Sequence, residues 1–257
     1  MFARLRRTQP TLPHFGQPAR ALTLVRNARA RQMKLSVDPR DGAIRLVLPP
    51  RMALGQALKW VETKRDWVEV QLGRVMPAAS IAPGESIPYR GRPLLIDWSA
   101  ERPRTPRHDG DRLILGGPAE TVESRVKRWL RAQAKQLLDA ETRDIATRAG
   151  VTIAAVGVGD TRSRWGSCSS NGDIRYSWRL ILAPDFVRIA TVTHEVAHRV
   201  HMDHSPAFHA LVARLLGTDA KPARTWLRQH GSSLHRVGAR DAKAHGESAQ
   251  GGVGRGS

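Results

Sequence analysis

Five short strand-like runs lie in the first half of the chain, and apolar and polar residues alternate in the second and third of them. Alternation of this kind is typical of half-buried strands. The second and third runs flank a polar turn at 38–42, which favours an antiparallel pair. The predicted strands are therefore 22–25, 33–37, 43–48, 94–96 and 112–115.

Helical spacing of apolar residues predicts four helices. The first covers 54–72, and the second runs from 121 to about 148 and ends at Gly150. The third begins near Pro184 and extends to about Val200, and the fourth follows Ser205 and Pro206. A strand over 151–158 and a hairpin within 160–182, which turns at Asn171-Gly172, lie between the second and third helices.

This order of elements predicts an α+β protein in four parts, with no internal repeat evident in the sequence. The parts are a flexible basic arm, a β-rich N-terminal region with one helix, a mixed domain, and a disordered tail rich in Gly, Ser and Ala. Their predicted ranges are 1–20, 21–118, 119–237 and 238–257.

Composition narrows the class of protein. A chain of 257 residues is long enough to bury a sizeable core. Its single cysteine, Cys168, excludes an intrachain disulfide framework and a cysteine-rich zinc module. No run approaches 18 apolar residues, the length of a membrane-spanning helix. We therefore expect a soluble cytoplasmic protein with no membrane partner.

The chain is strongly basic, with 42 Lys and Arg against 23 Asp and Glu and a formal net charge of +19. Its first 37 residues hold eight basic side chains and no acidic one. Such a surface attracts polyanions, including nucleic acid, without sequence preference. The alternative interpretation is that the many basic residues only keep the protein soluble. A transit peptide is disfavoured because Pro10, Pro13 and Pro18 would interrupt an amphipathic helix.

The sharpest chemical signal is the pentapeptide His194-Glu195-Val196-Ala197-His198. Residues four apart share one face of a helix, so both imidazoles can reach one metal ion. Glu195 can then take a proton from a water that zinc activates. The alternative is two ordinary polar residues on an amphipathic helix, but the five histidines within 194–209 favour a zinc site.

A catalytic zinc site needs a third protein ligand. A Glu on a following helix is excluded, because the only later Glu is Glu247 in the predicted tail. His204 lies ten residues after His194, the spacing of HExxHxxGxxH metallopeptidases, although His201 stands where that motif has Gly. His204 is therefore the favoured third ligand, and the residues that compete with it are His201, Asp203 and His209.

The segment from 164 to 208 resembles a known family. The matching residues are Arg164-Trp165-Gly166-Ser167-Cys168-Ser169, Gly172, Ile174, Trp178-Arg179-Leu180, Ala183-Pro184, His194 to His198, and His204-Ser205-Pro206-Ala207-Phe208. They resemble the YgjP-type metallopeptidases, which are related in plan to SprT-like zinc proteases. The resemblance is dense over 160–230 and weaker upstream. It departs from the family at His209, where a Trp is common.

The resemblance implies a zincin-like metallopeptidase domain over 119–237, with the HExxH motif on a helix. It also implies that His194, His198 and His204 bind Zn²⁺ and that Glu195 is the catalytic base. One branch of the family is associated with pyrophosphatase activity on UTP.

Four further residues are candidates for the site. Cys168 is interpreted as a small buried thiol rather than a nucleophile. Arg164, Arg175 and Tyr176 are predicted to contact substrate by holding a carboxylate, a phosphate or a developing oxyanion.

The predicted function is zinc-dependent hydrolysis of a peptide or protein substrate, with Glu195 as general base. Two alternatives remain: a metal-dependent nucleoside triphosphate pyrophosphatase acting on UTP, and a nucleic-acid-associated protein with a structural zinc site.

Overall fold

The computed structural model describes residues 12–17, 19–73, 75, 79–161 and 163–238. The chain divides into two compact units, Met1–Pro77 with Arg240–Ser257, and Ala78–Ala239. Each has its own hydrophobic core. Among the described residues, no helix combines the length and apolar character needed to cross a membrane.

The division falls earlier than the boundary that we predicted after residue 118. The strands expected at 94–96 and 112–115 belong to the second unit. Their buried residues Leu94, Ile96 and Leu113 share one core with the long helix of that unit. Hydrophobic alternation identifies a strand but not the core against which the strand packs, so the sequence placed the boundary too late.

The first unit is a four-stranded sheet with two helices. Its strands, in the order β1-β2-β4-β3, are β1 (His14–Phe15), β2 (Arg20–Arg26), β3 (Lys34–Val37) and β4 (Ile44–Leu48). Leu22, Leu46 and Leu48 are buried with Val61 and Val68 of the helices. The helices are α1 (Leu54–Glu62) and α2 (Arg65–Gly73).

Two expectations for this unit need correction. Phe15 is only 1% exposed and lies in a strand, so the described part of 1–20 is not a flexible arm, whereas 1–11 and 18 lie outside the described residues. The single helix predicted over 54–72 is two helices. The hydroxyl of Thr63 donates to the carbonyl of Trp60, a local bond that competes with helix continuation.

The second unit begins with a sheet of the same topology. Its order is β5-β6-β8-β7, and the inner pair is parallel while both outer pairs are antiparallel, as in the first sheet. The two four-stranded sheets therefore repeat one plan that the sequence does not reveal. The strands are β5 (Ser86–Tyr89), β6 (Arg92–Trp98), β7 (Arg107–Asp109) and β8 (Arg112–Leu115).

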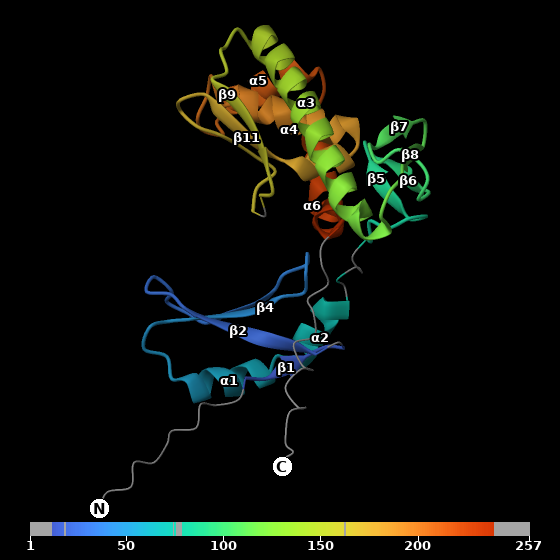
Figure 1. Ribbon diagram of the computed structural model, residues 1–257. Helices are drawn as coiled ribbons and strands as arrows, with labels where there is room; N and C mark the ends of the chain where they lie inside the picture. Colours follow the sequence, from blue (N-terminus) through green and yellow to red (C-terminus); the bar gives the residue numbers. More distant parts are fainter. Residues whose placement is uncertain (1–11, 18, 74, 76–78, 162, 239–257) are drawn as a thin grey trace, which may run out of the picture. The chain divides into compact units, whose positions relative to one another are not determined.

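The long helix α3 (Val122–Ala149) follows a short 3₁₀ turn, η1 (Ala119–Thr121). It is the longest helix of the second unit (Figure 1). It ends as predicted at Gly150, which has a φ of 68° in the left-handed region. Every third or fourth residue from Val122 to Ala146 is buried along one face.

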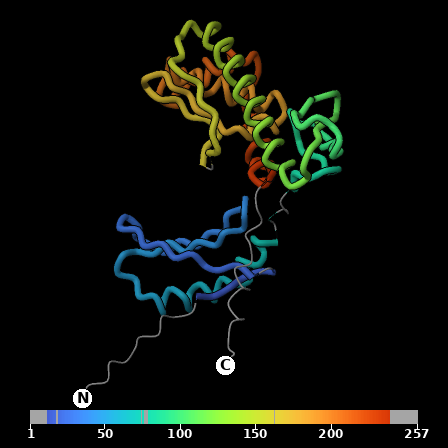
Figure 2. The backbone as a smooth tube through the Cα atoms, in the orientation of Figure 1, coloured from blue at the N-terminus to red at the C-terminus, as the bar shows by residue number. Residues whose placement is uncertain are grey.

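The third sheet carries the predicted hairpin. It has the order β10-β11-β9, in which β10 (Gly166–Cys168) pairs antiparallel with β11 (Asp173–Ser177), and β11 pairs parallel with β9 (Ala155–Gly159). The chain path can be followed in Figure 2. A 3₁₀ segment, η2 (Trp178–Leu182), then leads into the next helix.

Three helices complete the second unit: α4 (Asp185–Ala197), α5 (Pro206–Leu216) and α6 (Lys221–Arg236). α4 contacts α3, α5, α6 and β10, so it lies at the centre of the unit. The Ser205 hydroxyl caps α5 by accepting a bond from the Phe208 amide. We did not predict α6, and the predicted tail lies outside the described residues except for Gly238.

A buried ion pair joins α4 to α3. Arg188 is 1% exposed, and its Nη2 donates to Glu141 Oε1 at 2.7 Å. Its Nη1 also donates to Asp185 Oδ1 at 2.6 Å. A buried guanidinium that loses a carboxylate keeps the cost of desolvation without the compensating attraction.

We therefore expect Glu141→Gln to lower the free energy of unfolding by roughly 3 kcal/mol. Chemical denaturation followed by circular dichroism measures the change. The matched control is Asp139→Asn on the same helix, which breaks a pair with Arg143 whose side chain is 58% exposed. That control should cost no more than about 0.5 kcal/mol, and an equal loss in both variants would contradict this view of Arg188.

Candidate metal centre

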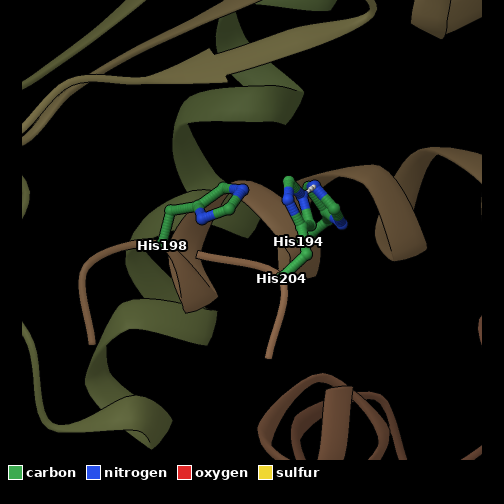
Figure 3. Close-up of side chains that lie close together, drawn as sticks. All are labelled: His194, His198 and His204. Atoms are coloured by element: carbon green, nitrogen blue, oxygen red, sulfur yellow. Dashed lines mark hydrogen bonds between the residues drawn. The ribbon is translucent and has the colours of Figure 1, made fainter. Parts of the chain in front are cut away.

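Three histidines converge at the end of α4. His194 lies in the last turn of the helix, and His198 is its C-cap with helical φ and ψ of −64° and −15°. His204 comes from the segment that precedes α5. One ligand nitrogen from each residue lies within 4.8 Å of the others. Figure 3 shows the rings of His194 and His204 together, with the ring of His198 facing them.

A backbone bond orients His198. Its Nδ1 lies 2.9 Å from the carbonyl oxygen of His201. A carbonyl only accepts, so Nδ1 carries the proton and Nε2 keeps its lone pair for a ligand. This pattern, in which the second ring nitrogen is bound by an outer partner, is typical of histidines that hold metals.

The other two rings point their nitrogens at one another. His194 Nε2 and His204 Nε2 are 3.2 Å apart. Burial, together with electrostatic interaction with the neighbouring His198 and His204, lowers the pKa of His194 to about 4. His194 is therefore neutral near pH 7. Nitrogen donors in this neutral form fit zinc, for which imidazole is a common ligand.

The ring of Phe208 contacts all three histidine rings. It is fully buried in α5, and its ring stacks on His198 with centroids 4.6 Å apart. The rings of His194 and His204 both lie 4.9 Å from it at steep angles. Contact with one rigid ring restricts all three imidazoles. We did not identify this role in the sequence, although the position of Phe208 four residues after His204 was a signal for it.

Glu195 lies beside the cluster on the buried side of α4. It is 7% exposed, and burial raises the pKa of its carboxyl to about 7, while the nearby positive charge of Arg164 acts in the opposite direction. Gly166 at the start of β10 lies directly against it. Glu195 is thus a buried acidic residue that directly follows His194 in α4 and lines the same cavity as His194.

A family model described as the YgjP-like metallopeptidase domain matches residues 31–230. The match covers most of the chain and includes all three histidines and Glu195. The chain belongs to the YgjP-like metallopeptidase family. No curated protein and no solved structure matches it. Membership of this YgjP-like family implies a bound metal, typically zinc, and the His194, His198 and His204 cluster is able to hold one.

Gly166 leaves room for the carboxyl of Glu195 in this family member. A Cβ at position 166 would lie 2.5 Å from Glu195 Oε1 and 2.6 Å from its Cγ. These distances are too short for any side chain, so Glu195 would have to move. Should Glu195 act in catalysis, Gly166→Ala is expected to lower kcat by roughly 100-fold, because a shift of about 1 Å in a reacting group has that effect.

The control for this prediction is Gly159→Ala in the same sheet, where a Cβ meets nothing within 4 Å. That variant should keep its activity, and both variants should bind zinc like the wild type. Metal content and steady-state kinetics are the measurements. Full activity of Gly166→Ala would show that the position of Glu195 is not critical.

Two of the three predicted substrate contacts need correction. Tyr176 is fully buried, and its hydroxyl lies 3.1 Å from that of Thr142 on α3, so it is a core residue. Arg175 is the neighbour of Tyr176 in β11 and therefore lies on the opposite face of the sheet from Tyr176 and its cross-strand partner Gly166. Arg164 is exposed and close enough to Glu195 to affect its pKa.

The three residues that competed with His204 as the third ligand do not join the cluster of nitrogen donors. Asp203 is exposed, and its Oδ1 accepts a bond from the Ser205 amide at 3.3 Å. The ring of His209 is centred 6.4 Å from that of His204. His201 contributes its backbone oxygen to His198. Burial raises the pKa of the Cys168 thiol, which disfavours the thiolate form that a nucleophile needs.

Proposed function

We propose that this protein is a zinc-dependent peptidase with a zincin-like catalytic domain, in which His194, His198 and His204 hold the metal and Glu195 is the general base. The observation that carries the proposal is the convergence of three imidazole nitrogens within 4.8 Å, with the buried Glu195 on the wall of the cavity that His194 also lines. Membership of a metallopeptidase family supports it.

Zinc bound at this site would supply Lewis-acid chemistry, which lowers the pKa of a water and polarises a carbonyl. The carboxylate of Glu195 accepts the proton of the attacking water at one of its oxygens and later passes it to the amine that leaves. Burial suits Glu195 to this exchange, because it raises the pKa of the carboxyl and so makes the carboxylate a stronger base than an exposed one. The positive charge of Arg164 favours the ionised carboxylate that starts the cycle.

The proposal is tested with casein and, separately, with UTP. We expect protein stripped of metal to leave casein intact and the addition of zinc to restore cleavage. UTP should remain intact in both samples. Hydrolysis of UTP that depends on zinc, with casein untouched, would instead establish phosphoanhydride hydrolysis as the reaction.

A further inference from the structure

A cavity of about 350 Å³ opens beside the histidine cluster. It lies among α4, α5, α6 and the start of β10, and His194 and Glu195 form part of its wall. Its volume is at the small end of the range for ligand sites, roughly 300 to 1,000 Å³. It is thus large enough for a single amino-acid residue with a large side chain.

Most of the remaining wall is apolar. The ring of Trp165 borders the cavity, and its atom Cζ2 would lie 2.9 Å from a Cβ at Gly231 of α6, so α6 supports it closely. Such a wall favours an apolar side chain in the cavity. The aliphatic residues that line it are Ala190, Val212, Ala213, Ala220, Ala223 and Leu227.

One cation lines this apolar cavity. Arg224 in the first turn of α6 is exposed, and within the described residues it has no hydrogen bond or ion pair with any other side chain. Its charge is close enough to His194 to disfavour protonation of that ring. Asp219 also lines the cavity, but its Oδ1 accepts a bond from the Lys221 amide at 2.8 Å. The guanidinium of Arg224 is therefore open to an anionic group of the substrate.

The size of the cavity limits which anion Arg224 can bind. Arg224, His194 and Glu195 line the same cavity, whose volume of about 350 Å³ admits about one residue between the cation and the histidine cluster. An apolar side chain and a carboxylate within one residue are the features of a C-terminal Leu, Phe or Met. Arginine binds carboxylates with two parallel hydrogen bonds, which fixes their orientation.

We propose that the cavity binds the C-terminal residue of a peptide, with its apolar side chain among α4, α5 and α6 and its α-carboxylate on Arg224. This inference rests on the proposed peptidase function and makes the protein a carboxypeptidase for apolar C-terminal residues. The last peptide C–N bond breaks. The oxygen and one hydrogen of water go to the new carboxyl group, and the other hydrogen goes to the amine that leaves.

The first test uses two peptides that differ only at the C-terminus, N-acetyl-Ala-Ala-Phe and its C-terminal amide. We expect kcat/KM for the acid to exceed that for the amide by roughly 10- to 100-fold, the effect of a hydrogen bond to a charged group. Arg224→Gln should remove this preference, whereas Arg228→Gln, one turn further along α6, should keep it. Equal rates for both peptides in a wild type that is inactivated by Glu195→Gln would overturn the inference and leave the proposed function standing.

The second test measures binding without catalysis or metal. Titration calorimetry of metal-free protein with N-acetyl-phenylalanine and with its amide should show that the acid binds roughly 10-fold more tightly or better. That preference should be lost in Arg224→Gln. If the acid and the amide bind equally well, or if the preference persists in Arg224→Gln, Arg224 is not the carboxylate site.

A third variant tests the side-chain part of the cavity. Ala213 lines it and is exposed on α5, so Ala213→Leu should fold normally while it fills the space. We expect kcat/KM for a peptide ending in Phe to fall by roughly 10-fold or more, with little change for one ending in Ala. An equal effect on both peptides would contradict a side-chain pocket at this place.

Discussion

Replacement of Glu195 with Gln is expected to lower kcat by roughly 10²- to 10⁴-fold, the usual contribution of a general base. Gln has nearly the same shape but does not accept a proton from water. Zinc should remain bound at a molar ratio of one, because the proposed ligands are His194, His198 and His204. Steady-state kinetics and elemental analysis of the purified variant measure the two effects.

Asp203→Asn is the matched control for this variant. Asp203 lies next to a proposed ligand, but its carboxylate is exposed and accepts a bond from the Ser205 amide, which an Asn side chain also supports. Its kcat should stay within about 2-fold of the wild type, in line with the small effects of most exposed substitutions. An active Glu195→Gln enzyme, or an inactive Asp203→Asn enzyme, would place the base elsewhere.

Removal of the His204 ring is expected to weaken zinc binding by about 100-fold or more, since loss of even an outer partner costs roughly 10- to 100-fold. His204 is exposed and belongs to no regular element, so His204→Ala should fold like the wild type. Competition with a chromogenic chelator gives the dissociation constant for zinc in each variant.

Two neighbouring histidines provide the controls. His201 contributes a backbone oxygen to the site, and the ring of His209 is centred 6.4 Å from that of His204. His201→Ala and His209→Ala should therefore bind zinc nearly as tightly as the wild type. If either substitution releases the metal while His204→Ala retains it, the third ligand has been assigned to the wrong residue.

The sequence predicted regular elements better than their packing. The α3 helix and its end at Gly150 follow from a continuous apolar stripe and a left-handed glycine. The sequence did not predict α6, because Gly231 and the two serines that follow it interrupt the apolar pattern and have low helix propensity. The helix is nevertheless continuous, and Ala223 and Leu234 are buried along one face. The pairing of the two four-stranded sheets depends on contacts distant in sequence, which local patterns do not report.

The site was predictable where its chemistry is local. His194, Glu195 and His198 occupy one short stretch, and helix periodicity places the two histidines on one face, with Glu195 next to the first of them in the chain. The role of Gly166 depends on β10 lying against α4, a tertiary contact without a local signal. The sequence predicts Tyr176 as a substrate contact, but its position in β11 turns its hydroxyl toward Thr142 in the core.

X-ray absorption at the zinc edge of the loaded protein is the most direct test of a shared ion. The account predicts three imidazole nitrogens at about 2.0–2.1 Å from zinc, one of which is lost in His204→Ala. A spectrum with sulfur from Cys168, or one that His204→Ala leaves unchanged, would contradict it.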